Sequence, residues 1–243
     1  MSYSVIATAT RQGTSADNAD SSAVFHMPDS EWSGAAIVDG IGHGPDVVEL
    51  SYLAAQVAAR VGVRKTSILG VLAAAELAAG PAAALITPDA VAVLALTAPD
   101  METSLAWTGD CRAYGYDPAT DRLTQRTTDH TVGQYLRVNG VPIELAEEHD
   151  NWARCTLGKS SIATVHQVVV EDPLILLTSD GVHDQMTHET LENLVREHHT
   201  DPQALADAIV NAAQDFQDED EPGGIYRDDA TAIVIHVTPS PQN

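Results

Sequence analysis

Positively charged residues are scarce in this sequence of 243 residues. Lys and Arg number 12 against 35 Asp and Glu, which gives a formal net charge of −23, and the only lysines are Lys65 and Lys159. A field of that sign repels phosphate backbones and anionic lipids, so we expect no nucleic acid and no membrane as a partner. It attracts cations, and by itself the acidity fits plain solubility as well as a metal-binding role.

Cysteine is also scarce. Cys111 and Cys155 are the only two, too few for a zinc site built from cysteine alone or for a dense disulfide framework. One disulfide between them is one interpretation, but two thiols in a reducing cytosol fit better.

Long apolar stretches are missing too. The most apolar segment, residues 82–98, is interrupted by Pro88 and Asp89, so nothing approaches the roughly 20 apolar residues of a membrane-spanning helix. Residues 1–10 lack the basic segment followed by an apolar one that marks a secretory signal. We therefore expect a cytoplasmic protein.

Apolar residues nevertheless make up 44% of the chain, which is enough for a substantial core. Alternating or continuous apolar runs predict about ten strands, over residues 5–10, 23–27, 35–39, 91–97, 104–107, 112–116, 123–126, 166–170, 174–178 and 231–237. Four longer helices are predicted over residues 45–61, 67–79, 188–198 and 202–216, and a short one over 132–138.

The helices come in two pairs separated by a block of strands, which disfavours a Rossmann or barrel layout. The pattern predicts an α+β fold with two antiparallel sheets flanked by helix pairs. Residues 140–151 are interpreted as a surface excursion and 218–224 as an acidic loop. Because there is no repeat or linker, we expect one domain over residues 1–238, followed by a frayed tail over 239–243.

Acidic residues stand at the ends of three of these apolar strands. They occur in the pairs Asp39-Gly40, Asp180-Gly181 and Asp228-Asp229. A single Asp-Gly pair is more often just a turn. Three acids fixed at strand ends are harder to dismiss, because hard divalent cations prefer carboxylate and carbonyl oxygens. The spacing therefore favours a Mg²⁺ or Mn²⁺ site over a zinc site.

Six short segments occur in an order typical of one enzyme family. They are Arg11 with Asn18-Ala19-Asp20, then residues 38–44 (VDGIGHG), 107–114 (WTGDCRAY), 128–131 (TDHT), 177–182 (LTSDGV) and 228–231 (DDAT). The chain resembles the metal-dependent protein phosphatases (the PPM or protein phosphatase 2C-like family) over nearly its whole length. The forms of the second and last segments look closest to the bacterial stage-II-sporulation and stress-regulator phosphatases.

The resemblance implies a four-layer α-β-β-α sandwich with a dinuclear Mn²⁺ or Mg²⁺ centre at one end. Asp39 would bridge the two cations, and the carbonyl of Gly40 would bind the second of them. Asp180 and Asp228 would hold the first cation. Asp129, together with Asp180, would hold a weak third one.

The resemblance also implies a reaction. A hydroxide activated by the metals at the dinuclear centre would hydrolyse phosphoserine or phosphothreonine in a phosphorylated protein, without a covalent phosphoenzyme. Arg11 would grip the substrate phosphate with two parallel hydrogen bonds. The structural alternative for Arg11 is an ion pair with Asp17 or Asp20. We expect a monomer.

Several positions depart from the family pattern. Ala19 stands where the family usually has Glu, so that Asp20 remains as the acid of the outer shell, unless Asp17 replaces the missing group. Ile41 stands where many eukaryotic members have a histidine. His43, two residues on, is a candidate general acid, and the alternative is that it only orders its loop.

One further acid and two bases have open roles. Asp110 is interpreted as ordering a turn rather than binding metal. Lys159 and Arg154 are equally compatible with substrate contact and with salt bridges.

Two functions of different classes remain open at this point. The first is an active protein serine/threonine phosphatase, which in a narrower version acts on an anti-sigma-factor antagonist. The second, motivated by Ala19, is a catalytically weak or inactive member that binds a phosphoprotein as a regulator.

Overall fold

Two five-stranded antiparallel sheets lie face to face in the computed structural model, which describes residues 4–78, 87–213, 216–217 and 225–237. One sheet has the order β1-β12-β9-β6-β7, with strands Val5–Arg11, Ala230–His236, Leu174–Thr178, Arg112–Asp117 and Arg122–Gln125. The other has the order β2-β3-β4-β5-β8, with strands Asp20–His26, Ser33–Ile41, Asp89–Thr97, Thr103–Thr108 and His166–Val170.

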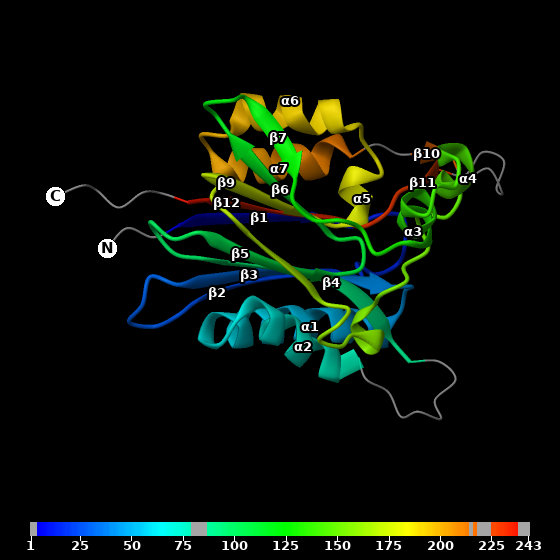
Figure 1. The fold of residues 1–243 in the computed structure, drawn as a ribbon, viewed down its shortest axis with the longest axis horizontal. Helices are drawn as coiled ribbons and strands as arrows, with labels where there is room; N and C mark the ends of the chain where they lie inside the picture. The colour runs from blue at the N-terminus through cyan, green and yellow to red at the C-terminus, as the bar shows by residue number, and fades with distance from the viewer. Residues whose placement is uncertain (1–3, 79–86, 214–215, 218–224, 238–243) are drawn as a thin grey trace.

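A pair of helices covers the outer face of each sheet (Figure 1). Helices α1 (Pro45–Arg64) and α2 (Ser67–Ala78) pack on the second sheet, and α6 (His188–His198) and α7 (Pro202–Ala212) pack on the first. The predicted four-layer α-β-β-α sandwich is therefore confirmed. Among the described helices, none is long and apolar enough to cross a membrane.

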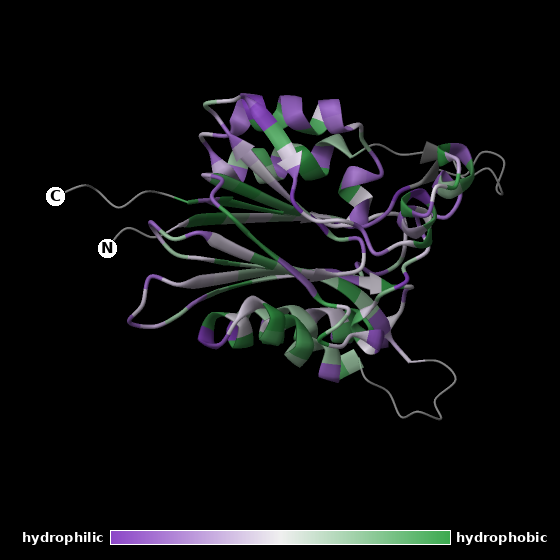
Figure 2. Ribbon diagram, in the orientation of Figure 1, coloured by the Kyte–Doolittle hydropathy of each residue, from purple (hydrophilic) through white to green (hydrophobic). Residues whose placement is uncertain are grey.

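Three apolar layers hold the four structural layers together. Successive side chains of a strand point to opposite faces. In β3, Ile37 accordingly lies between the sheets and Val38 lies under α1 and α2. In β9, Leu177 lies between the sheets and Leu176 under α6 and α7. Both faces of these strands are buried, which explains why they appear as continuous apolar runs (Figure 2).

The structure departs from the predicted elements in a few places. Strand β2 begins at Asp20, three residues earlier than predicted, because Asp20 pairs with Asp39 of β3. The excursion over residues 140–151 contains a short helix, α4 (Ile143–Glu147), after Pro142. The last predicted helix ends at Ala212, and residues 216–217 instead form a strand, β10 (Phe216–Gln217), that pairs with β11 (Ile225–Tyr226).

Two short helices complete the described chain. The predicted helix over residues 132–138 is present as α3 (Val132–Val138). Helix α5 (Asp180–His183), which was not predicted, follows β9 directly. The predicted acidic loop over 218–224 and the tail over 239–243 lie outside the described residues.

Helices α1 and α2 approach closely enough to need glycine at their contact. A Cβ atom on Gly70 would lie 2.6 Å from the carbonyl oxygen of Ala58 and 2.8 Å from the Cα of Gly62. A Cβ on Gly62 would instead meet the tip of Leu94, at 2.7 Å. Backbone atoms cannot give way as the end of a leucine side chain can.

We therefore expect Gly70→Ala to destabilise the protein, by about 1–3 kcal/mol of overpacking. In an ordinary helix interior the same change would stabilise by up to about 1 kcal/mol, so the sign is diagnostic. Gly62→Ala is the matched control and should cost less, because Leu94 can move. Urea unfolding curves of the two variants measure the difference, and a Gly70→Ala variant at least as stable as wild type would contradict the close contact.

Candidate active site

A cavity of about 440 Å³ lies where residues of the two sheets meet at one end of the sandwich. Five acids line it, together with residues of the β3–α1 loop and of the segment that precedes β8. The acids are Asp39, Asp89, Asp110, Asp180 and Asp228, and the other lining residues are Gly40, Ile41, Gly42, His43, Val91, Asn151, Ala153, Thr156 and Lys159. We call this cavity the acid pocket.

Strand ends from both sheets carry the acids into the pocket. Asp39 lies near the end of β3 in the second sheet. In the first sheet, Asp180 begins α5 two residues after β9, and Asp228 lies two residues before β12. Strands β9 and β12 are neighbours in that sheet, so these two acids come from adjacent strand ends. Asp110 comes from the turn between β5 and β6, where Gly109 has a φ of 92°.

Burial and mutual repulsion disfavour the ionised form of these carboxyl groups. Burial, reinforced by the charge of Asp180, raises the pKa of Asp39 well above its usual range. Burial and the charge of Asp110 do the same to the pKa of Asp180. Burial raises the pKa of Asp110 to about 6. Carboxylates in this situation ionise together only when a cation compensates them.

The donor set of the pocket suits a hard divalent cation. Its side chains offer carboxylate oxygens, which are the ligands that Mg²⁺ and Mn²⁺ prefer, and no thiolate. In the part of the chain that the structure describes, however, no three His, Cys, Asp or Glu side chains are arranged to hold one ion. The acids therefore converge on a common pocket rather than on a finished coordination sphere.

Gly40 lets α1 pack against the end of β3. A Cβ there would lie 2.5 Å from Val47 Cγ1, 2.7 Å from Ser51 Oγ and 2.9 Å from the carbonyl oxygen of Ala19. The Gly40 N–H donates to that same carbonyl at 3.2 Å. Glycine is thus required at this position by a close backbone approach.

Asp20 stands beside Asp39 on the neighbouring strand. The Ser179 hydroxyl donates to the Asp20 carboxylate at 2.7 Å, and its oxygen accepts the Thr231 N–H at 3.0 Å. Burial raises the pKa of Asp20 to about 7, although the hydrogen bond from Ser179 lowers it. This chain of contacts links Asp20 in one sheet to Ser179, directly before Asp180, in the other.

Asp229 has a role that the sequence reading did not identify. Its buried carboxylate accepts the Gly13 and Ala19 N–H groups, each at 2.7 Å. The loop that carries the unusual Ala19 is therefore held through its backbone. The signal was available, because Asp229 is the second acid of the Asp228-Asp229 pair.

Comparisons with known proteins agree with this geometry at the level of the fold. No family model and no curated protein matches the chain. Among solved structures, the serine/threonine phosphatase of S. agalactiae has a TM-score of 0.73 at 14% identity, over 97% of this chain and all of that one. Stp1 from Staphylococcus aureus has a TM-score of 0.71 at 16% identity, over 97% and 96% of the two chains.

A third solved structure carries metal. The catalytic domain of the phosphatase PstP, in complex with two manganese ions, has a TM-score of 0.67 at 21% identity, over 97% of this chain and 98% of that one. The chain has the fold of the bacterial PPM serine/threonine phosphatases. At these identities the likeness extends to the PPM fold alone, and the sporulation or stress-regulator subtype stays a prediction.

Within this PPM fold, the structure brings most of the predicted site residues together. Asp39, Gly40, Asp180 and Asp228 line the acid pocket. His43 lines it as well, and its Nε2 lies 3.1 Å from the Ser15 hydroxyl. Their roles as ligands and as general acid stay predictions.

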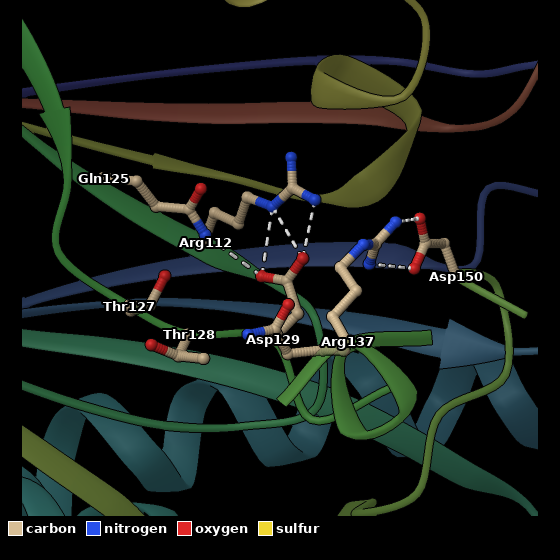
Figure 3. Close-up of a pocket in the computed structure, with 8 residues that line it drawn as sticks. Arg112, Gln125, Thr127, Thr128, Asp129, Arg137 and Asp150 are labelled. Atoms are coloured by element: carbon tan, nitrogen blue, oxygen red, sulfur yellow. Dashed lines mark hydrogen bonds and ion pairs between the residues drawn. The ribbon is translucent and has the colours of Figure 1, made fainter. Parts of the chain in front are cut away.

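Asp129 does not line the acid pocket. It accepts hydrogen bonds from Arg112 Nε, at 3.0 and 3.1 Å, and from Arg112 Nη2, at 2.6 Å. Both residues line a neighbouring cavity of about 440 Å³, together with the ion pair of Arg137 and Asp150 (Figure 3). The predicted role of Asp129 as a ligand thus has to compete with a bidentate arginine. Asp110 lies in the turn between β5 and β6, as interpreted from the sequence, and it also lines the acid pocket.

Arg11 also lies outside the set of residues that line the acid pocket. It ends β1 opposite Ala230 of β12. Its Nη1 donates to the carbonyl oxygen of Ala213, just beyond α7, at 2.9 Å. The structure therefore shows Arg11 closing the end of a helix.

The raised pKa values predict how the metal-free protein responds to pH. The folded state holds protons on Asp20, with a pKa of about 7, and on Asp110, with a pKa of about 6, whereas an unfolded chain releases them near 3.8. Lowering the pH in EDTA from about 8 to about 6.5 should therefore raise the melting temperature by several degrees. Mn²⁺ at pH 8 should stabilise the protein in the same way, because it compensates the same charges.

Two histidines set the lower limit of that window. Burial lowers the pKa of His130 to about 4 and that of His183 well below its ordinary value. Below about pH 6.5 an unfolded chain therefore binds protons at these histidines that the folded state does not, which offsets the gain in stability from the acids. Asp20→Asn is the control and should reduce the pH response of the melting curve. A melting temperature in EDTA that falls steadily from pH 8 to 6.5 would show that the pKa values of these carboxyl groups are not raised in the folded state.

Proposed function

We propose that this protein is a Mn²⁺- or Mg²⁺-dependent protein serine/threonine phosphatase that acts on phosphorylated proteins. The observation that carries the proposal is the acid pocket, in which Asp39, Asp180 and Asp228 come from the ends of two facing sheets. The PPM fold supports it, since a phosphatase of that fold binds two manganese ions.

Three carboxylates and one backbone carbonyl would hold two cations. Asp39 and Gly40 line the pocket from the second sheet, and Asp180 and Asp228 from the first. Divalent cations there supply a nucleophilic water of lowered pKa and neutralise phosphoryl charge. For a weak third cation the pocket offers Asp110, whereas Asp129 is held by Arg112.

Other residues of the chain position these groups. Asp20 and Ser179 tie the end of β3 to the start of α5 across the two sheets. His43 is exposed and lines the pocket, and we assign to its imidazole the proton that the leaving alkoxide of the phosphoamino acid takes up. Each of these contacts is made by side chains or backbone of this chain and exists before substrate arrives.

The second candidate function is a phosphoprotein-binding regulator with little or no turnover. One observation favours it, since Ala19 puts a buried methyl group where the family carries an acid. Phosphatase activity is nevertheless the better-supported proposal, because Asp229 holds the Ala19 backbone in place.

Hydrolysis of p-nitrophenyl phosphate should require Mn²⁺ or Mg²⁺ and resist thiol alkylation. EDTA should abolish turnover and added Mn²⁺ should restore it, because the cations activate the attacking water. Thiol alkylation should have no effect, because no thiol lies among the groups that line the pocket. Burial raises the pKa of Cys111 well above its ordinary value, which keeps that thiol protonated and inert. Full activity in EDTA would refute the proposal. Absence of activity in Mn²⁺, with phosphoprotein binding retained, would also refute it and would support the phosphoprotein-binding regulator.

Asp39→Asn should cost more activity than any other single acid substitution. A carboxylate shared by both cations contributes several kcal/mol, or on the order of 1,000-fold in kcat. Asp180→Asn and Asp228→Asn should also abolish turnover. Glu76→Gln, at an exposed site on α2, is the matched control and should leave kcat unchanged.

Asp129→Asn should reduce turnover and leave the two tight cations bound. Its carboxylate neutralises Arg112 and so contributes indirectly to the pocket. Metal titration by calorimetry, run beside the kinetics, measures both effects. Loss of both tight cations from Asp129→Asn would mean that the roles of the acids are assigned wrongly.

A further inference from the structure

The acid pocket contains a single basic side chain of the Lys or Arg type. Of the described residues that line it, Lys159 is the only lysine or arginine, and it faces five carboxyl groups. Even so, no carboxylate oxygen of the described chain lies within 4.0 Å of its ammonium in an ion pair. The salt-bridge interpretation of Lys159 is therefore not what the structure shows.

The backbone beneath Lys159 is firmly held. Lys159 ends a 3₁₀ turn, Leu157–Lys159, and Asp89 at the start of β4 pins that turn. The Asp89 carboxylate accepts the Thr156 hydroxyl at 2.6 Å and the Gly158 N–H at 2.8 Å. An exposed lysine on such a support keeps its ammonium near the pocket while its side chain stays free to move.

The chemistry of the pocket identifies the partner of this ammonium. Once divalent cations compensate Asp39, Asp180 and Asp228, the pocket no longer carries the excess negative charge that would hold a lysine. A phosphoryl group bound there brings negative oxygens, and lysine binds phosphate as a compact charge with three donors. Arg11, the residue that the family resemblance implies for this task, is not among the residues that line the pocket, and its Nη1 donates to the carbonyl oxygen of Ala213.

We propose that Lys159, rather than Arg11, binds the phosphoryl group of the substrate. The inference rests on the proposed phosphatase function and deepens it. In this chain the phosphate-binding cation comes from the segment before β8, which Asp89 fixes to the second sheet. Lys159 is thus a substrate-binding residue that acts on the phosphoryl oxygens themselves.

Kinetics of Lys159→Met tests the proposal with a matched control. Loss of one charge-assisted hydrogen bond should raise KM for p-nitrophenyl phosphate about tenfold or more, and lower kcat/KM at least as much. Lys159→Arg should recover most of that loss. Lys65→Met, which removes the only other lysine, at the exposed end of α1, should match wild type.

The same assay separates the competing explanations. A phosphothreonine peptide should show the same rise in KM as p-nitrophenyl phosphate. If only the peptide is affected, Lys159 contacts the peptide and the proposal is wrong. It is also wrong if Arg11→Met raises KM for the small substrate while Lys159→Met does not. We expect Arg11→Met to lower the melting temperature and to leave KM within about twofold of wild type.

A second measurement needs no turnover. Because the chain has two lysines, acetylation by an amine-reactive ester can be followed at each of them by peptide mass spectrometry. Inorganic phosphate with Mn²⁺ should slow acetylation of Lys159 severalfold and leave that of Lys65 unchanged. Equal rates at Lys159 with and without phosphate would overturn the proposal. If phosphate slows acetylation of Lys159 but the protein shows no turnover, the proposed phosphatase function is wrong and the phosphate-binding role of Lys159 stands.

Discussion

The burial of several carboxyl groups in one pocket is the constraint on which the rest of this structure depends. Asp39, Asp110 and Asp180 stand in one pocket, and burial together with the neighbouring charges raises the pKa of each. A sequence that folds around such a cluster gives up stability that its three apolar layers have to offset. The cations proposed to bind there would compensate these charges, so the feature that costs stability lies at the proposed functional site.

Hydrogen bonds connect the residues around the acid pocket to both sheets. Asp229 anchors the loop before β2, and Ser179 joins Asp20 to the backbone of β12. These contacts hold the strand ends in place independently of any side chain at Ala19. An alanine at position 19 is therefore compatible with the frame of the pocket.

The sequence predicted those features that depend on local pattern. Runs such as β9 are apolar on both faces and end in an acid, so both the sandwich and three acids of the pocket followed from them. It did not predict which charged groups meet in space. Asp129 lies 17 positions from the arginine that holds it, and Asp229 bonds a residue 210 positions away. No periodicity encodes such partners, which is why the sequence assigned Asp110 to its turn but not to the acid pocket, and left Lys159 open between substrate contact and a salt bridge.

The pairing of the first strand with the last has a consequence for synthesis on the ribosome. Among the described strands, β1 pairs with β12 alone, and β12 separates β1 from β9. During translation, all strands of the second sheet and helices α1 and α2 are synthesised before β12. Until β12 has been synthesised, β1 has no strand to pair with, and Asp228 is also among the last residues to be added. The nascent chain therefore exposes an unpaired strand edge for most of its elongation, the kind of edge that chaperones protect. A metal centre that includes Asp228, as proposed above, can therefore be completed only late in synthesis.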